Sequence, residues 1–261
     1  MRILFFGDIV GRVGLKALFS FLRKPEYASA DLIIANGENV TDGKGISKED
    51  YFSMTNHGIA FFTLGNHYDS KKSIRPMFNN AEDLVFPANL LEQDPLKQVR
   101  TVKIGNTHIV ITSLLGQGFS SYEVKNPLYV FDEIYKAYPN SFHFVDFHGE
   151  STSEKKIFGF YVRDRAKVVV GTHTHVQTND LQLLSPNTLF MSDVGMCGAS
   201  KSVIGFNFES VYNRLYLNEG RFKVEEEGAM LINGVDISFC PDKQCFVEYH
   251  VIKEEINDVE R

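Results

Sequence analysis

The chain has 261 residues, of which 43% are hydrophobic and 23% are charged. This is the composition of a folded globular protein, and it excludes an intrinsically disordered chain. The formal net charge of -6 at pH 7 argues against an extended face for DNA or RNA, while a small phosphorylated substrate is compatible with it. The apolar runs are too short for a signal peptide or a membrane span, so we expect a cytoplasmic protein. The three cysteines form no C-x-x-C pair, which favours reduced thiols.

Short apolar runs that end in Gly, Asn, Asp or His predict strands buried on both faces. These runs span residues 2–6, 32–35, 60–64, 142–147 and 168–170. Between them, apolar residues at helical spacing predict helices over 13–22 and 204–217. Ser47 with Asp50 resembles a capping box, which predicts a helix extending to about residue 57.

Two segments predict antiparallel hairpins within this alternation. Residues 99–113 have a strand pattern on each side of Gly105-Asn106, and residues 223–253 have turn signals at Asn233-Gly234 and at Pro241-Asp242. Strands that alternate with helices, with hairpins added, predict an α/β fold with mixed sheets. No linker, repeat or low-complexity segment interrupts the pattern, so we expect a single domain over residues 1–261.

Polar side chains that can bind metals or protons follow five of the predicted strands. They are Asp8; Glu38 and Asn39; Asn66 and His67; His148; and His173 and His175. Because ligands of open α/β sheets bind beyond the carboxyl ends of the strands, we expect these side chains to converge. Turn chemistry explains any one of them, but it gives no reason for imidazoles, carboxylates and carboxamides at five separate strand ends.

The mixture of imidazole nitrogen with carboxylate and amide oxygen is typical of first-row metals such as manganese, iron or zinc. The number of groups suits two ions, provided that a carboxylate bridges them. In extended backbone, His173 and His175 would point to the same side, whereas the adjacent Asn66 and His67 would point in opposite directions. We therefore expect Asn66 to face the metals and His67 to face the substrate.

Two motifs, Gly65-Asn66-His67 and Gly171-Thr172-His173-Thr174-His175, resemble the G-N-H and G-H-T-H signatures of calcineurin-like metallophosphoesterases. Five longer stretches are similar to the YmdB-like phosphodiesterase branch: residues 7–11, 36–39, 146–155, 170–178 and 192–196. The chain has Asp8-Ile9-Val10 where most of the superfamily has D-x-H, and Glu38-Asn39 where it has G-D-x-x-D; these are substitutions of that branch. Tyr68-Asp69 departs from it, because the branch has Thr-Trp there.

The resemblance implies a four-layered α/β/β/α sandwich and two divalent or mixed-valence metal ions, with iron or manganese favoured over zinc. By the same resemblance, Asp8, Glu38, Asn39 and His175 would hold the first metal, and Glu38 (bridging), Asn66, His148 and His173 the second. His67 would stand beside the metals without ligating them. A homo-oligomer is implied as well. Glu150 and Asp193 flank the motifs and are candidates to orient ligand imidazoles as hydrogen-bond acceptors.

The activity that the resemblance implies is hydrolysis of small phosphodiesters, above all 2',3'-cyclic nucleotides such as 2',3'-cAMP. A metal-bridging hydroxide would attack phosphorus, and His67 would be the general acid for the leaving alkoxide. Two alternatives stay open. The first is a phosphomonoesterase that acts on nucleotides or phosphoproteins with the same metals. The second is a regulatory or RNA-associated binding protein, although such a protein has no need of an unligated His67.

Overall fold

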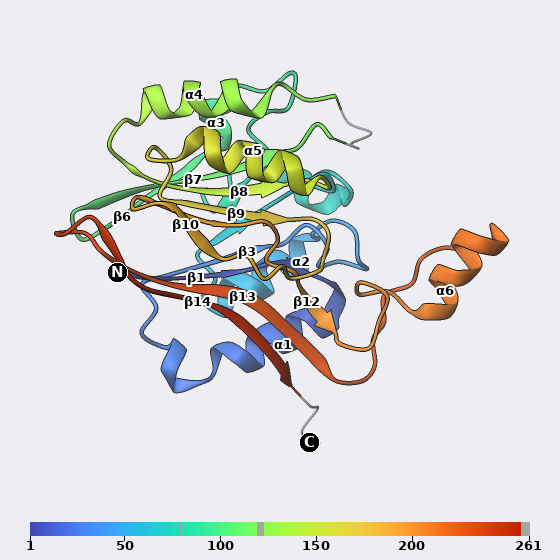
Figure 1. Cartoon of the computed structure of the whole chain (residues 1–261). Coiled ribbons are helices and arrows are strands. Elements are labelled where there is room, and N and C mark those ends of the chain that lie inside the picture. The colour runs from blue at the N-terminus through green and yellow to red at the C-terminus, as the bar shows by residue number, and fades with distance from the viewer. Residues whose placement is uncertain (79, 119–122, 257–261) are drawn as a thin grey trace.

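Two β-sheets lie face to face, and helices cover the outer side of each (Figure 1). The computed structural model describes residues 1–78, 80–118 and 123–256. This is the α/β/β/α arrangement that the family resemblance implies, with the mixed sheets that the strand pattern predicts. Among the described residues, no helix has both the length and the apolar character needed to cross a membrane.

The first sheet has eight strands, and the four at one end of it, from β1 to the edge strand β5, are parallel. Its strands follow the order β2-β12-β13-β1-β3-β4-β5, while β14 pairs along the other side of β13. Their bounds are β1 Arg2–Phe6, β2 Asp8–Ile9, β3 Leu32–Asn36, β4 Phe61–Thr63, β5 Leu84–Val85, β12 Met196–Ala199, β13 Met230–Cys240 and β14 Cys245–Ile256. Because β1, β3, β4 and β5 run parallel, their carboxyl ends lie at the same edge of the sheet.

The second sheet has six strands in the order β10-β11-β9-β8-β7-β6. Their bounds are β6 Arg100–Ile104, β7 Thr107–Leu115, β8 Phe142–His148, β9 Val168–Thr172, β10 Gln182–Ser185 and β11 Thr188–Met191. The four inner strands are parallel, and β6 and β10 are antiparallel strands at the two edges. The inner strands are buried on both faces, which explains why their sequences are continuous apolar runs.

Apolar side chains from both sheets fill the space between them, and Phe5 of β1 packs on Phe144 of β8 with ring centroids 5.4 Å apart. Helices α1 (Gly11–Leu22) and α2 (Lys48–Asn56) cover the first sheet, and α4 (Pro127–Ala137) and α5 (Thr152–Val162) cover the second. The shorter helices are η1 Pro25–Tyr27, η2 Lys72–Met77, α3 Pro95–Gln98, α6 Phe208–Tyr212 and the π-helical turn η3 Asn213–Leu217.

Three local predictions are confirmed. Helix α1 contains the predicted residues 13–22, and β6 and β7 form the predicted hairpin around Gly105-Asn106. Ser47 is the N-cap of α2, and its hydroxyl accepts a hydrogen bond from the Asp50 backbone N–H at 3.1 Å. That bond satisfies a backbone donor that the first helical turn leaves without a partner.

The predicted helix over residues 204–217 is wrong in its first part. Ile204 has a positive φ of 48° in a tight turn, and helix begins at Phe208. Leu215 and Tyr216 are among the exposed apolar side chains of this segment. Figure 1 shows α6 projecting from the body of the sandwich. The helical spacing of apolar residues therefore marks an exposed apolar surface here, rather than a face packed on a sheet.

The predicted turn at Asn233-Gly234 is also wrong, because β13 continues through both residues. Gly234 instead lets β13 lie close to β1, since a Cβ there would lie 2.6 Å from the Phe5 carbonyl oxygen. The turn predicted at Pro241-Asp242 is confirmed and joins β13 to β14. Cys240 and Cys245 are paired residues across this hairpin, and both are free thiols.

Candidate metal centre

The eight predicted site residues form one connected group of hydrogen bonds and close contacts where strand ends of the two sheets meet. They are Asp8, Glu38, Asn39, Asn66, His67, His148, His173 and His175. Each follows or ends a strand, as predicted: β1, β3 and β4 in the first sheet, and β8 and β9 in the second. Their roles as ligands stay a prediction; their convergence is a fact of the fold.

Two glycines allow this crowding. A Cβ on Gly65 would lie 2.2 Å from Glu38 Oε2 and 2.4 Å from the His148 ring, so a larger residue before Asn66 would push these groups apart. A Cβ on Gly7 would lie 1.9 Å from the Gly195 carbonyl oxygen, so glycine is also needed where the chain turns from β1 into Asp8. Contacts this short cannot be relieved by small side-chain shifts.

His148 is held by a chain of hydrogen bonds behind it. Thr172 Oγ1 donates to Asp146 Oδ1 at 2.6 Å, and its lone pair faces His148 Nδ1 at 2.9 Å. Since that hydroxyl gives its hydrogen to Asp146, His148 Nδ1 must carry a proton and donate to it. His148 Nε2 therefore points at the centre of the site. Its neighbours there are Glu38 Oε1 at 3.2 Å, Asn66 Oδ1 at 2.8 Å and His173 Nδ1 at 3.0 Å.

The charges of this group shift its pKa values. Burial lowers the pKa of His148, but Glu38 and Asp8 outweigh that effect and raise it to about 9. Burial raises the pKa of Glu38, but His148 and His67 outweigh it and hold the pKa well below its usual range. Burial together with His148 lowers the pKa of His173 to about 4. The buried carboxylates thus raise the pKa of His148, while burial and His148 itself lower the pKa of its neighbour His173.

These contacts fit a metal cation better than they fit a proton. One N–H of His148 faces three acceptors, Glu38 Oε1, Asn66 Oδ1 and His173 Nδ1, and it cannot satisfy all of them. Glu38, His148 and His173 each offer a ligand atom within 4.8 Å of the others. Nitrogen and oxygen donors in this mixture suit a first-row divalent metal. His173 Nε2 also lies 3.2 Å from Glu150 Oε2, the acceptor that the sequence predicted for a ligand imidazole.

Asp8 and His175 lie on the Asn39 side of Glu38, and Asn39 contacts all three of these side chains. Asn39 Nδ2 lies 3.3 Å from Asp8 Oδ1, 3.3 Å from Glu38 Oε1 and 3.0 Å from His175 Nε2. His175 Nδ1 donates to the Ile204 carbonyl oxygen at 2.8 Å, so its Nε2 lone pair faces the site. Burial raises the pKa of the Asp8 carboxyl, and His175 and His148 only partly offset it. A second cation here would stabilise the Asp8 carboxylate.

Two geometric arguments made from the sequence are wrong. His173 and His175 have positive φ angles of 106° and 65°, so the loop after β9 is not extended, and the two imidazoles face different parts of the site. Asn66 and His67 lie in a turn rather than in extended backbone. His67 consequently also contacts the group, with Nδ1 2.9 Å from Asn39 Oδ1 and 3.4 Å from Glu38 Oε1.

Asp193 orients a loop rather than an imidazole. Its Oδ2 accepts from the Thr174 N–H at 3.0 Å and from the buried Lys155 Nζ at 2.7 Å, and its Oδ1 accepts from the Gly195 N–H at 2.8 Å. These bonds fix the loop that carries His173 and His175. Sequence reasoning assigned no role to Lys155, because a buried ion pair leaves no local pattern in the chain.

Asp146 and Thr172 were also missed as supports of the site. A signal for them was present, because alternate residues of a strand lie on one face. Asp146 stands two residues before His148 on β8, and it also accepts hydrogen bonds from Thr63 on β4 and Asn36 on β3. Its carboxyl group therefore joins both sheets behind the site. Burial raises its pKa to about 6.

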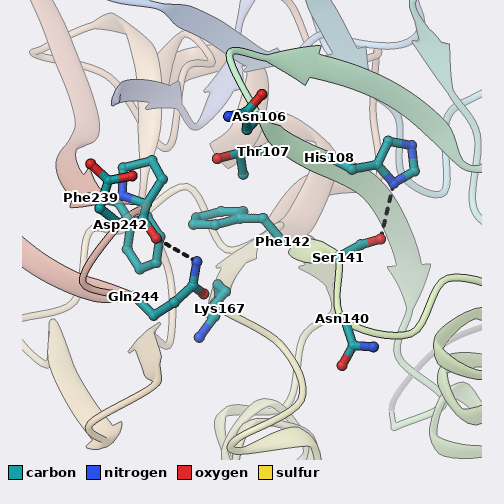
Figure 2. Close-up of a pocket in the computed structure, with 11 residues that line it drawn as sticks. Asn106, Thr107, His108, Asn140, Ser141, Phe142, Lys167, Phe239, Asp242 and Gln244 are labelled. Carbon is teal, nitrogen blue, oxygen red and sulfur yellow. Dashed lines mark hydrogen bonds between the residues drawn. The ribbon is translucent and has the colours of Figure 1, made fainter.

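A cavity of about 280 Å³ opens beside the group. Its polar lining includes Glu38, His67, Glu150 and His173, and its apolar lining includes Phe206. A second hollow of about 240 Å³ lies near the start of β8 and the tip of the β13–β14 hairpin (Figure 2). In that hollow His108 is bonded to Ser141 and Gln244 to Pro241, and no group of metal ligands gathers among its described residues. The first cavity, at the carboxyl ends of the strands, is the candidate active site.

Comparison with known proteins gives the family. A model of the YmdB-like protein family matches residues 4–251. The chain belongs to the YmdB-like family. A 2',3'-cyclic-nucleotide 2'-phosphodiesterase of Bacillus subtilis (strain 168) is 37% identical over 241 residues, which cover 91% of this chain and 90% of that protein.

Solved structures agree with this assignment. The crystal structure of a phosphatase from Mycoplasma pneumoniae aligns with a TM-score of 0.91 at 30% identity, over 99% of this chain and 95% of that one. A hypothetical protein from Thermus thermophilus aligns with a TM-score of 0.87 at 29% identity, over 98% of this chain and 100% of that one. Both chains are matched over nearly their full lengths, so the fold that they share with this chain extends through the whole sandwich.

A metal that binds His148 Nε2 must displace its proton, so metal affinity should depend on pH. Below the His148 pKa of about 9, the binding constant for Mn²⁺ should rise about tenfold per pH unit, with release of about one proton. Titration calorimetry at about pH 6.5 and 7.5 in buffers of different ionisation enthalpy measures both quantities. An affinity that does not change with pH would show that His148 does not exchange a proton for the metal.

The position of Glu38 predicts a second outcome. Its Oε1 lies between the His148 side and the Asn39 side of the group, so the charge-removing substitution Glu38→Gln should weaken both halves together. Metal analysis after dialysis against Mn²⁺ should find both equivalents reduced. Glu133→Gln, on the exposed face of α4, is the matched control and should keep them. Loss of a single equivalent from the Glu38 variant would make that residue a terminal ligand.

Proposed function

We propose that this YmdB-like protein is a metal-dependent phosphodiesterase that opens 2',3'-cyclic nucleotides, 2',3'-cAMP among them. The broad class of this enzyme, phosphoric ester hydrolase, is given by the names of its relatives. The observation that carries the proposal is the group formed by the buried Glu38 and His148 and the half-buried His173, whose ligand atoms lie within 4.8 Å of one another beside a cavity of about 280 Å³. Such a site can hold both a metal and a small phosphate ester.

The substrate class is supported by the Bacillus subtilis relative, whose name is 2',3'-cyclic-nucleotide 2'-phosphodiesterase and which matches nine-tenths of the chain. The chemistry is consistent with it, because strain in a five-membered cyclic phosphate makes ring opening easier than cleavage of an acyclic diester. The size of the cavity also suits a mononucleotide better than a long polymer.

The proposed ligand assignment follows the two sides of Glu38. Asp8, Glu38, Asn39 and His175 hold one ion, and Glu38, Asn66, His148 and His173 hold the other, with iron or manganese favoured over zinc. When bound, the ions polarise the phosphoryl oxygens and provide a nucleophile from water near neutral pH. The prediction of a single domain over residues 1–261, of a homo-oligomer and of a cytoplasmic location stays a prediction from the sequence.

His67 is the proposed general acid. It lines the cavity, and its Nδ1 contacts Asn39 Oδ1 in the orientation observed. To act as a general acid, His67 must carry protons on both ring nitrogens: its Nδ1–H then donates to Asn39 Oδ1, and its Nε2–H can be given to the leaving alkoxide, which leaves a neutral imidazole. Imidazole is the side chain best suited to such a transfer near neutral pH.

A substrate panel tests the proposed activity. The Mn²⁺-loaded protein should hydrolyse 2',3'-cyclic AMP much faster than 3',5'-cyclic AMP or AMP, and EDTA should abolish the reaction. The rate of product formation by chromatography measures this. Faster hydrolysis of AMP would support the phosphomonoesterase alternative. No hydrolysis of any of the three, with metal bound, would contradict the phosphodiesterase and favour the binding-protein alternative.

His67→Gln separates proton transfer from metal binding. The variant should keep both metals but lose roughly 10²–10⁴-fold in turnover of 2',3'-cyclic AMP. With bis(p-nitrophenyl) phosphate the loss should be much smaller, because nitrophenolate leaves without protonation. His57→Gln, an exposed histidine on the outer side of the first sheet, is the control and should leave both rates unchanged. Equal losses on both substrates would mean that His67 positions the phosphate, and loss of metal would make it a ligand.

A further inference from the structure

The cavity at the metal centre has an apolar side that the phosphate chemistry does not explain. Ile204 and Phe206 line it together with the polar groups Glu38, His67 and His173. A phosphate ester needs the polar groups for its charge, but it gains nothing from an aromatic ring. The rest of the substrate must therefore account for Phe206.

The loop that presents Phe206 is a tight hairpin turn. Val203 and Phe206 exchange two backbone hydrogen bonds of 2.8 and 3.0 Å, and the two residues between them, Ile204 and Gly205, both have positive φ, 48° and 97°. A two-residue turn of this kind needs positive φ at both central positions. A β-branched residue such as Ile204 rarely adopts it, and backbone strain of this sort gathers at functional sites.

The turn contacts two segments of the candidate site, the loop that carries His175 and the segment that follows Asp8. The Ile204 carbonyl oxygen accepts from His175 Nδ1 at 2.8 Å, so the same turn orients one of the candidate ligands. At Gly205 a Cβ would lie 2.6 Å from Val10 Cγ1, and Val10 directly follows the short strand β2, which begins at Asp8. The position of Phe206 relative to the metals is therefore set by direct contacts, and not by a free loop.

The Phe206 ring packs against neighbouring residues, yet part of it stays exposed to the cavity. A Cβ on Gly43, which has a φ of 73°, would lie 2.7 Å from Phe206 Cε1, so this glycine makes room for the ring. Phe222 supports it from another direction, with ring centroids 5.7 Å apart. Phe206 is half-buried and lines the cavity. A rigid, partly exposed aromatic ring beside a phosphate-binding group is suited to stacking on a planar base.

We infer that Phe206 stacks on the nucleobase of the substrate while the phosphate lies at the metal centre. This inference rests on the proposed function, because it names the part of that site that recognises the base. Stacking on an aromatic side chain contributes about 1–3 kcal/mol per base. Every base has a π-face, so the contact accepts all four bases but favours purines, which offer a larger surface.

The test compares two substrates that share the reacting ring. One is 2',3'-cyclic AMP, and the other is methyl riboside 2',3'-cyclic phosphate, which has no base.

Phe206→Leu keeps an apolar side chain but removes the ring, and Phe206→Tyr keeps the ring. We expect Phe206→Leu to lower kcat/KM for 2',3'-cyclic AMP by about 5- to 150-fold, which is the stacking energy converted to a ratio. For the base-free substrate, kcat/KM should change by less than about 2-fold. Phe206→Tyr should retain most of the wild-type kcat/KM for 2',3'-cyclic AMP, because it keeps the ring. Phe208→Leu, two residues away and exposed, is the matched control.

Direct binding gives a readout that does not depend on turnover. Protons of the adenine ring should shift upfield in the NMR spectrum when AMP binds the wild-type protein, and this shift should be lost in Phe206→Leu. Equal losses of kcat/KM on both substrates, with no upfield shift, would overturn the inference and assign Phe206 a structural role. Unchanged kcat/KM for both substrates would overturn it as well. If the wild-type protein hydrolyses neither cyclic phosphate, the proposed function fails, and the AMP shift alone then decides whether Phe206 stacks a base.

Discussion

Two carboxylates, Asp8 and Glu38, are buried where the sheets meet, and the site is organised by the need to balance their charge. Neither is more than 1% exposed. A buried carboxylate without a partner costs several kcal/mol, so it must neutralise, pair or bind a cation. His148 Nε2 lies 3.2 Å from Glu38 Oε1, and against the effect of burial the two carboxylates raise the pKa of His148 to about 9. A divalent cation held beside Glu38 and Asp8 would stabilise the same two carboxylates.

The surrounding structure serves to hold this charge in place. Asp146 accepts hydrogen bonds from both sheets and fixes His148 through Thr172, while Asp193 fixes the loop of His173 and His175. The glycines before Asp8 and Asn66 let backbone and ligands approach at distances that no other residue permits. These supports are far apart in the sequence, so the site depends on the correct stacking of the two sheets.

The sequence predicted the strands, the mixed sheets and the residues that converge at the site, because these follow from local patterns, whereas the four layers were implied by the family resemblance. Buried parallel strands appear as apolar runs, and their carboxyl ends gather polar side chains at one edge, so Asp8, Glu38 and His148 could be brought together without coordinates. Loop geometry could not be predicted in this way. His173 and His175 have positive φ angles that no spacing rule gives, and Gly234 was taken for a turn although it serves a close approach to β1. The role of Phe206 depends on a turn anchored to His175, a contact between segments about thirty residues apart.

The proposed mechanism depends on a pair of metal ions that share Glu38, and anomalous X-ray scattering tests this most directly. Crystals of the wild-type protein soaked in Mn²⁺ and measured on either side of the manganese edge locate each ion. We expect two anomalous peaks about 3.5 Å apart, one on each side of Glu38. One peak should adjoin Asn66, His148 and His173, and the other should adjoin Asp8, Asn39 and His175. A single peak, or peaks that Glu38 does not contact, would contradict the two-metal site.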